Sequence, residues 1–287
     1  MSRLEKVSSL VIKGLIYEVS ISPKPGLVDR YTNGAHTDMD FYTFVDSSFA
    51  LVDYFTKLAE IGYGFKGGDL RLLFDSIREP GKKAEEAMFT ATKGVNTHKG
   101  LIFSLGVIAC ASGVLLKKGV DLSPLNITET CKQMLNGLIE KDFGGVTLDN
   151  AKTNGEKLFA KYNVTGIRGE AASGFETVIE KVLPVFKLNL ASKNFNTAAV
   201  YALMESISVL DDTNILARSG FEALEYVKGQ ANSILKTHWD SDKVFMEKVS
   251  EMDRDLIDMH ISPGGSADLL AIAIVLYFLE NEFSVSQ

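Results

Sequence analysis

Apolar residues recur along most of the chain at the three- and four-residue spacing that places them on one face of an α-helix. The pattern is clear over 4–15 and again over 41–59. Further helical stretches are predicted near 82–92, 100–117, 127–140, 149–161, 171–188, 195–210, 219–236, 241–257 and 265–281. No run alternates between apolar and polar residues with the period of two that is typical of a β-strand. The sequence therefore predicts an all-α fold.

Some of these helices have recognisable ends. Asp40 is suited to cap the N-terminus of the helix that follows it, and Gly119 is suited to stop the helix that ends at Lys118. The longest uncharged run, 101–116, is shorter than the ~20 residues that cross a bilayer. We therefore expect a buried central helix there, and no membrane partner.

No low-complexity linker, long charge block or internal repeat divides the 287 residues. Residues 1–287 are therefore predicted to form one large domain, with many helices around a substantial core. Hydrophobic residues make up 46% of the chain and charged residues 23%, which is ordinary for a globular protein. The net charge of −7 argues against a nucleic-acid partner, although a locally basic pocket could still hold an anionic small ligand.

The N-terminus and the two cysteines both favour the cytoplasm. Lys13 and Glu18 interrupt the N-terminal apolar stretch and no small-residue cleavage site follows it, so we expect no signal peptide. Cys110 and Cys131 lie in apolar-patterned segments. We predict that they are buried thiols, which suits a reducing compartment.

Five short polar, glycine-bearing segments interrupt the helical pattern. Each of them borders a strongly apolar helix, which a loop in solvent would not require. We therefore predict that they are helix ends facing a shared interior cleft, which would be the active site. The five segments are "SPKPGLVDRYTNGAHTDMD" (22–40), "ATKGVNTHKG" (91–100), "GIRGE" (166–170), "DDTNILARSG" (211–220) and "ISPGGSADLL" (261–270).

The second segment has residues suited to bind an anion. Asn96, Thr97, His98 and Lys99 come directly before an apolar helix, whose N-terminus would offer free N–H groups and partial positive charge. The spacing is not that of a Walker A loop, and no strand precedes it. Anion binding and a simple capped loop both fit this pattern.

The last segment repeats the arrangement. Gly264 and Gly265 allow close approach to the backbone, and Ser266 and Asp268 lie at the start of the last apolar helix. Asp268 would also fit the plain role of a first-turn partner for the helix dipole, and the glycines could serve only the turn.

Acidic residues in two segments are compatible with a metal site. Asp211 and Asp212 are adjacent, and they repel each other unless solvent or a cation intervenes. Mg²⁺ would fit, because it takes one or two carboxylates together with phosphate and water. Asp38 and Asp40 could converge on the same ion, but exposed helix-end acids, with Asp40 as a cap, explain the pattern equally.

Basic residues in the five segments could together hold a polyanion. Arginine in particular matches the geometry of phosphate with its forked guanidinium group. These cations are Lys24, Arg30, Lys93, Lys99, Arg168 and Arg218.

Taken together, the five segments resemble those of the triphosphoribosyl-dephospho-coenzyme A synthase family. They occur in the family's order between residues 22 and 271. Ser219 departs from the glycine that the family usually shows after the arginine, and Asp211 adds an acid before the family's aspartate at Asp212. The motifs that carry the resemblance are "SPKPGLVDR", "GVNTHKG", "GIRGE", "DTN" and "ISPGGSADLLA".

The resemblance implies an all-helical transferase that joins ATP to 3′-dephospho-coenzyme A. The 2′-hydroxyl of dephospho-coenzyme A attacks C1′ of the ATP ribose, adenine leaves, and the triphosphate stays on the product. A second transferase would then pass this prosthetic-group precursor to an acyl carrier protein, that of citrate lyase or of malonate decarboxylase. The sequence does not decide between the two pathways, and it leaves a homodimer open.

Catalytic roles follow from this implied chemistry. Departure of adenine builds positive charge at C1′, as in glycoside hydrolysis. Asp29 or Asp40 is therefore predicted to act at the sugar. His36 or His98 is predicted to give the leaving purine a proton or a hydrogen bond.

Metal and substrate binding complete the implied site. Mg²⁺ is expected on Asp212 and Asp38, as the partner of the ATP substrate. The predicted substrate-binding residues are Lys24, Arg30, Lys93, Asn96, Thr97, Lys99, Arg168, Glu170, Asn214, Arg218, Ser262, Gly264, Gly265 and Ser266.

Two other functions remain compatible with the sequence. The first is a metal-dependent helical hydrolase acting on nucleotides or N-glycosides, since "DDTN" loosely resembles helical ADP-ribosyl hydrolases. The adjacent His-Asp pair of helical metal phosphohydrolases is absent, however. The second is a non-enzymatic scaffold, which would leave the clustered ionisable residues without a purpose.

Overall fold

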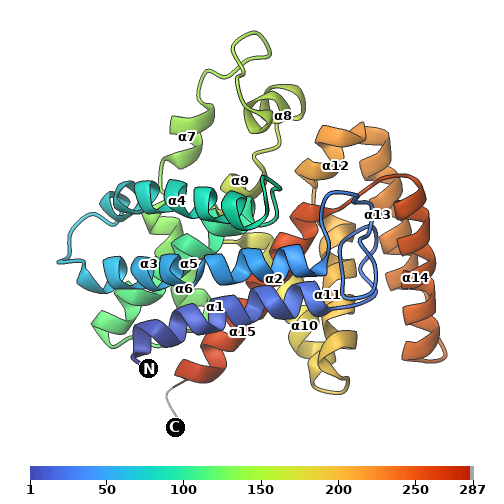
Figure 1. Ribbon diagram of the computed structural model, residues 1–287, viewed down its shortest axis with the longest axis horizontal. Coiled ribbons are helices and arrows are strands. Elements are labelled where there is room, and N and C mark those ends of the chain that lie inside the picture. Colours follow the sequence, from blue (N-terminus) through green and yellow to red (C-terminus); the bar gives the residue numbers. More distant parts are fainter. Residues whose placement is uncertain (285–287) are drawn as a thin grey trace.

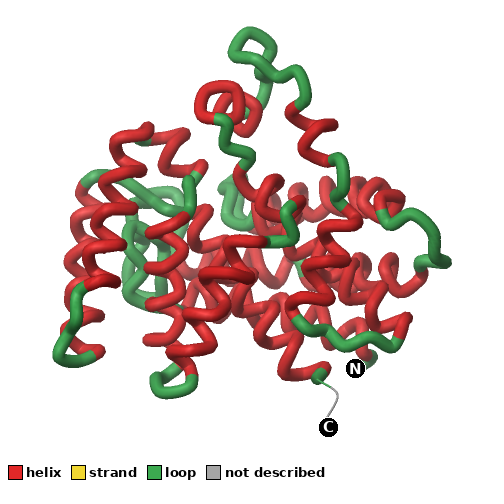
Figure 2. Tube along the Cα trace, turned by 180° about the vertical axis from the view of Figure 1, so that it is seen from behind, coloured by secondary structure: helices red, strands yellow, loops and turns green. Residues whose placement is uncertain are grey.

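The computed structural model describes residues 1–284 and contains fifteen α-helices and one π-helical turn. No strand occurs within these residues, so the predicted all-α fold is confirmed (Figure 1, Figure 2). The elements are α1 (Arg3–Ser20), α2 (Phe41–Ala50), α3 (Val52–Gly64), α4 (Arg71–Ala91), α5 (Lys99–Lys118), α6 (Pro124–Met134), α7 (Leu138–Phe143), α8 (Asn154–Tyr162), α9 (Gly166–Ala172), η1 (Val178–Val182), α10 (Leu183–Leu190), α11 (Phe195–Val209), α12 (Thr213–Arg218), α13 (Gly220–Lys236), α14 (Asp242–Asp258) and α15 (Gly264–Phe283).

Two long apolar helices, α5 and α15, supply much of the core. α3 packs along α5, and α1 packs along α15. Glycines let α3 and α5 come close: a side-chain carbon at Gly62 would lie 1.9 Å from the carbonyl oxygen of Cys110, and one at Gly113 would lie 2.0 Å from that of Ala59. α5 is long and apolar enough to cross a membrane, but 83% of its most apolar stretch is buried inside the protein. The predicted buried central helix is therefore confirmed.

The remaining helices surround this centre unevenly. α10 and α13 pack against α11, and α12, α13 and α14 lie together at one end of the molecule (Figure 1). α7 and α8, joined by residues 144–153, project from the body in both views (Figure 1, Figure 2). The first and last helices end close together, and Lys6 Nζ lies 3.0 Å from the carboxylate of Glu282.

Several predicted helix boundaries are wrong, because local features interrupt the apolar pattern. The stretch 41–59 forms two helices, α2 and α3, that meet at Leu51. The stretch 127–140 is also split, since Gly137 adopts a left-handed φ of 82° between α6 and α7. The stretch 82–92 is only the second half of α4, which continues through Pro80 because one missing N–H donor does not break a packed helix.

The segments 166–170 and 211–220, predicted to be irregular, largely form the short helices α9 and α12. The stretch 171–188 is broken where Gly174 adopts a φ of 83°, and it then winds through η1 into α10. α8 begins at Asn154, later than predicted. Short helices lack the length over which a period of 3.6 residues can be recognised.

The two predicted helix ends are confirmed. The backbone N–H of Thr43 donates to Asp40 Oδ1 at 2.8 Å, which makes Asp40 the N-cap of α2. Gly119 ends α5 with a left-handed φ of 67°. Both cysteines are buried and free, as predicted.

Candidate functional site

A cavity of about 390 Å³ lies where the N-terminal ends of α5, α9, α12 and α15 meet the loop that follows α1. All five polar segments of the sequence contribute to its wall. The N-terminus of a helix carries partial positive charge, so these four ends favour an anionic ligand. We therefore take this cavity as the candidate active site.

Most of the predicted site residues lie on the cavity wall. They come from segments that are far apart in the sequence, and folding brings them around one space. The predicted residues on the wall are Lys24, His36, Asn96, Thr97, His98, Lys99, Arg168, Glu170, Asn214, Arg218, Ser262, Gly264 and Gly265.

Three predicted acids are outside the wall that the described residues form. Asp29 is 2% exposed, and its Oδ1 accepts hydrogen bonds from the backbone N–H groups of Tyr31 and Thr32 at 2.7 and 2.9 Å. Asp40 is exposed and caps α2. The Asp38 side chain is 61% exposed. The structure therefore does not bring Asp29 or Asp40 to the cavity, where action at the sugar would require them.

Two predicted cations also lie elsewhere in the described structure. Arg30 is exposed and stacks over the ring of Tyr31, with 4.9 Å between the guanidinium carbon and the ring centroid. Lys93 is exposed after the end of α4, where it adopts a left-handed φ of 57°. Neither residue lines the cavity, so phosphate binding there would depend on the other four cations.

Asp212 and Ser266 lie directly behind the wall. Asp212 is 1% exposed, and its carboxylate accepts from the N–H of Asn214 at 2.9 Å, the N–H of Ser266 at 2.8 Å and the hydroxyl of Ser266 at 3.1 Å. Burial raises the pKa of Asp212, and these hydrogen bonds oppose that rise. The carboxylate thus joins the start of α12 to the start of α15, and its lone pairs are largely occupied.

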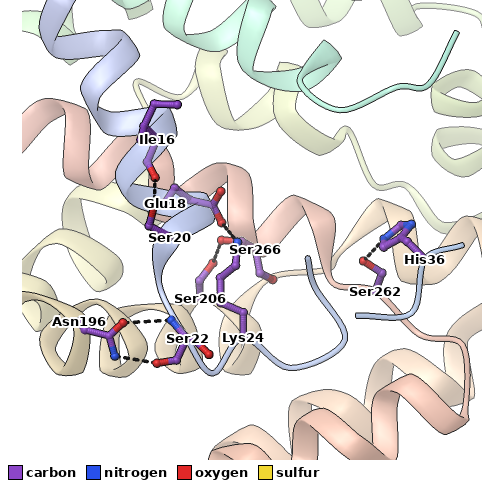
Figure 3. A network of polar contacts seen from close by, with 10 residues as sticks. All are labelled: Ile16, Glu18, Ser20, Ser22, Lys24, His36, Asn196, Ser206, Ser262 and Ser266. Carbon is purple, nitrogen blue, oxygen red and sulfur yellow. Dashed lines mark hydrogen bonds and ion pairs between the residues drawn. The ribbon is translucent and has the colours of Figure 1, made fainter. Parts of the chain in front are cut away.

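A buried ion pair forms part of the cavity wall. Lys24 Nζ lies 2.5 Å from Glu18 Oε1, and both side chains are almost fully buried (Figure 3). Burial raises the pKa of Glu18, while the charge of Lys24 and its hydrogen bond lower it. Each charge compensates the other in a site where an isolated charge would be costly.

His98 is the most deeply buried titratable group of the wall. It is 1% exposed, and its Nδ1 lies 2.7 Å from Ser47 Oγ. Its Nε2 has no hydrogen-bond partner among residues 1–284. Burial, assisted by the charge of Lys24, lowers the pKa of His98 to about 3, so the imidazole is neutral at physiological pH.

His36 approaches the cavity from the loop after α1. Its Nε2 lies 2.9 Å from Ser262 Oγ (Figure 3). Its Nδ1 lies 3.7 Å from Asp38 Oδ1. Burial and the charge of Arg218 lower the pKa of His36, and Asp38 only partly offsets this. The hydrogen bond to Ser262 connects this loop with the start of α15.

The cations of the wall differ in their partners. Lys99 Nζ lies 2.9 Å from Glu85, and Arg168 pairs with Asp142. Arg218 forms no ion pair with any described residue. A phosphate could therefore bind Arg218 without displacing an acid, whereas Lys99 and Arg168 would have to exchange partners.

Asp268 lines the cavity at the start of α15 and forms no hydrogen bond or ion pair within the described chain. Its carboxylate lies against the first turn of α5, since a side-chain carbon at Gly100 would be 2.3 Å from Oδ2. Burial and the nearby charges of Asp212 and Glu18 raise the pKa of Asp268 well above its usual value. Such a group is available to a ligand.

The predicted metal ligands do not form a cage. No group of three or more His, Cys, Asp or Glu side chains in residues 1–284 is placed to hold a metal ion. Of the adjacent pair in "DDTN", Asp211 rather than Asp212 lines the cavity, and Asp211 Oδ1 lies 2.6 Å from Lys228 Nζ. Mg²⁺ needs few protein ligands when phosphates and water supply the rest. Asp211 alone would suit that mode.

Two acids of the cavity wall, Glu18 and Asp268, are absent from the predicted site residues. Glu18 is an acid that continues the buried face formed by Val7, Val11 and Leu15, and an acid on such a face needs a partner. Asp268 lies in the last motif, but its fit to the role of a helix-dipole partner kept it out of the predicted site. The apolar part of the wall, which includes Val28, Met39 and Phe44, could not be told from ordinary core.

Comparisons with known proteins agree with this picture. Residues 4–287 match the family model of CitG, the ATP:dephospho-CoA triphosphoribosyl transferases. A probable 2-(5''-triphosphoribosyl)-3'-dephosphocoenzyme-A synthase of Streptococcus equi subsp. zooepidemicus is 41% identical, over 97% of this chain and 98% of the relative. The protein of the same name from Streptococcus pyogenes serotype M5 is 39% identical over the same shares. No solved structure matches.

The match covers nearly the whole chain, and the five motifs that suggested the family are the segments that meet at the cavity. The predicted family resemblance is thus confirmed. The chain belongs to the ATP:dephospho-CoA triphosphoribosyl transferase family and is a transferase.

Proposed function

We propose that the cavity joins ATP and 3′-dephospho-coenzyme A to give 2′-(5″-triphosphoribosyl)-3′-dephospho-coenzyme A and adenine. The observation that carries this proposal is the convergence of all five family motifs, with four helix N-termini and four basic residues, on one space. The 2′-hydroxyl forms a bond to C1′ of the ATP ribose while the bond from C1′ to the purine nitrogen breaks. The hydroxyl proton ends on adenine.

The triphosphate binds where the positive charge gathers. Arg218 is the first anchor, because no acid has to be displaced, and Lys99 and Arg168 exchange Glu85 and Asp142 for phosphate oxygens. The phosphates do not react, so their binding energy serves to orient the ribose. Such orientation contributes up to ~7–11 kcal/mol in favourable cases.

Asp268 acts at the sugar. The raised pKa of Asp268 reflects a carboxyl group that has no counter-charge in the free protein. The positive charge that builds at C1′ as the purine leaves supplies that counter-charge, so it favours the ionised carboxylate and is stabilised by it. Asp29 and Asp40, the acids predicted for this role, point elsewhere, whereas Asp268 lines the cavity. Replacement of Asp268 by Asn should lower kcat by about 10²–10³-fold. The exposed acid Asp258 supplies the control, since its replacement by Asn should leave the rate unchanged.

Mg²⁺ accompanies the triphosphate, with Asp211 as its ligand from the chain. When bound, the ion would neutralise phosphate charge and help to fix the chain of phosphates. Asp211→Asn should raise the Mg²⁺ concentration needed for half-maximal rate without changing thermal stability. Asp212→Asn should instead lower thermal stability, because an amide cannot accept all three hydrogen bonds that join α12 to α15. A metal requirement altered only by Asp212→Asn would restore the ligand assignment made from sequence.

The decisive experiment follows adenine by chromatography, with ATP, Mg²⁺ and the protein, in the presence and absence of 3′-dephospho-coenzyme A. Mass spectrometry of the same samples identifies the other product. We expect adenine only when both substrates are present, together with an adduct that retains the triphosphate. Adenine or phosphate released equally without dephospho-coenzyme A would show a hydrolase, and no product at all would refute the proposal.

The product would be passed in the cytoplasm to a second transferase, which loads it on an acyl carrier protein. The acyl carrier protein of citrate lyase and that of malonate decarboxylase are the two candidate acceptors. Supplying the purified product, the second transferase and each carrier in turn would identify the acceptor by its mass increase. Sedimentation of the protein alone would test a homodimer.

A further inference from the structure

One part of the cavity wall is apolar and belongs to a small hydrophobic cluster separate from the main core. Val28 and Met39 form this cluster with Val19, and Phe44 packs against it. Val28, Met39 and Phe44 all line the cavity. A flat, uncharged ring would pack favourably against these apolar side chains, whereas the charged triphosphate would lose its hydration there.

His98 stands beside this apolar part of the wall. Its ring meets the ring of Phe44 edge to face, with centroids 5.2 Å apart and an interplanar angle of 90°. The Nε2 atom is buried and has no partner among the residues that the structure describes. A buried polar atom without a partner costs free energy unless a ligand satisfies it.

Two hydroxyl groups beside Nδ1 favour one neutral tautomer of His98. Thr97 Oγ1 donates to Ser47 Oγ at 2.7 Å, so the Ser47 hydroxyl hydrogen is free to point to His98 Nδ1, which lies 2.7 Å away. In this arrangement Nδ1 accepts, and the ring proton resides on Nε2. The unpartnered atom is thus a hydrogen-bond donor.

We infer that His98 and the apolar wall of Val28, Met39 and Phe44 form the site of the ATP purine ring, and that Ser47 is a positioning residue that keeps the His98 Nε2–H directed at a ring nitrogen. This inference rests on the proposed function and goes further by assigning the leaving group its place. Burial holds the pKa of the His98 imidazolium near 3, so the ring is neutral in the free protein. The one N–H of a neutral imidazole donates a hydrogen bond but does not act as an acid.

The chemistry gives this hydrogen bond a role in the rate. When the bond between C1′ and the purine breaks, its electron pair moves to the purine, and negative charge spreads to the other ring nitrogens. A donor aimed at one of them binds the departing ring more strongly than the intact nucleotide, which is the condition for catalysis. Loss of the donor should therefore affect kcat more than the KM for ATP.

The tautomer can be measured directly. Nitrogen-15 NMR of the histidine side chains in the free wild-type protein should show His98 as the neutral Nε2–H form across pH 5–8. In Ser47→Ala, which cannot donate to Nδ1, the two neutral tautomers should interconvert. A wild-type His98 protonated on Nδ1 would overturn the inference, whatever the outcome for adenine release.

Kinetics of the same variant test its function. Ser47→Ala should lower kcat by roughly 10-fold, the effect of one neutral hydrogen bond, with little change in the KM for ATP. The matched control is Ser48→Ala: Ser48 is also buried in α2, but its hydroxyl donates only to the carbonyl of Phe44 within the helix. An equal decrease in kcat in the two variants would show that Ser47 has only a structural role.

Variants of His98 and analogues of ATP locate the acceptor. His98→Gln can place an amide N–H near the position of Nε2 and should retain part of the activity, whereas His98→Asn, with its shorter side chain, should lose about 10–100-fold. Replacing one acceptor nitrogen by carbon, in 3-deaza-ATP or 7-deaza-ATP, should slow the wild-type enzyme but have little further effect in His98→Asn. Additive losses for both analogues would refute the contact. If the wild type released no adenine, the proposed function would fail, and binding of ATP and its deaza analogues would still test the purine site.

Discussion

Two irregular segments of this protein look alike in composition but differ in structure. Residues 21–40 and residues 144–153 both lie between helices and combine glycine with polar and acidic side chains. In the first, Lys24 and Asp29 are each 2% exposed, and the segment meets the cavity. In the second, most residues are exposed, and the segment joins the projecting helices α7 and α8 (Figure 1).

The difference lies in the span of their hydrogen bonds. Ser22 exchanges two hydrogen bonds with Asn196 (Figure 3). Gly26 N donates to Asp253, so the first segment is fixed by residues far along the chain. The side-chain hydrogen bonds of 144–153 reach no further than five residues, as Asn150 and Gly145 illustrate. A polar loop becomes part of a site when distant elements satisfy its polar groups, because buried polar groups need such partners.

The largest effect should come from two glycines with the same backbone conformation. Gly26 has a φ of +68°, and an added side-chain carbon would lie 2.0 Å from the carbonyl oxygen of Ile261. Gly145 has a φ of +77° with open space around it. Urea unfolding should show a loss of more than about 3 kcal/mol for Gly26→Ala, and only the conformational cost of about 1–2 kcal/mol for Gly145→Ala.

Enzyme activity gives a second measure of the same pair. Gly26→Ala should also abolish adenine release, because Lys24 and His36 flank the displaced turn, and Gly145→Ala should not. Similar losses of stability in both variants would show that 21–40 is as loosely held as 144–153.

This contrast also explains how far the sequence could be interpreted. Helical periodicity predicted the all-α fold, because a buried stripe repeats over many residues in helices such as α5 and α15. The five motifs identified the family and most of the cavity wall. The order of the motifs along the chain was enough to identify the family, because it requires no knowledge of how far apart they lie in the folded protein.

Individual roles were harder to predict, because they depend on direction. Asp211 and Asp212 are neighbours in sequence, yet one faces the cavity and the other turns inward to hold α12 and α15. Asp29 lies in the longest motif but bonds to its own loop. Ser47 lies in no motif, and only the fold brings it to His98. Residue type and spacing do not determine which way a side chain points once the chain leaves a regular helix.

A smaller effect is expected for two asparagines. Asn196 Oδ1 accepts from Ser22 N at 3.0 Å, and its Nδ2 donates to the Ser22 carbonyl at 2.6 Å, 174 residues away in the sequence. Asn196→Ala should cost about 2 kcal/mol of unfolding free energy, since two partly buried backbone groups lose their partners. Asn150→Ala, which removes only local hydrogen bonds on the surface, should cost less than about 0.5–1 kcal/mol. If Asn150→Ala lowered the unfolding free energy as much as Asn196→Ala, the distinction between long-range and local attachment would be contradicted.

The smallest effect should appear as opposite pH dependences of two acids. Burial raises the pKa of Asp253, the partner of Gly26, to about 6, with repulsion from Asp29 adding to this and the Gly26 hydrogen bond opposing it. The folded state then binds a proton more tightly than the unfolded state, so this stability is present below pH 3.8 and is lost as pH rises through about 6. Solvent partly screens this carboxyl, so the loss is about 1 kcal/mol rather than the full 1.36 kcal/mol for each pKa unit. The free energy of unfolding of Asp253→Asn should therefore equal that of the wild type near pH 4 and exceed it at pH 7.5.

Glu156, in the first turn of α8 beside the second segment, should show the reverse. Hydrogen bonds from the backbone N–H groups of Lys152 and Thr153 lower the pKa of its carboxyl group. Its contribution is present at neutral pH and is lost as pH falls below its ordinary pKa toward the lowered folded value. Glu156→Gln should thus be less stable than the wild type at pH 7.5 and approach it near pH 3. Urea unfolding at these pH values would measure both differences, and slopes of the same sign would mean that the two acids occupy equivalent environments, contrary to their burial in the structure.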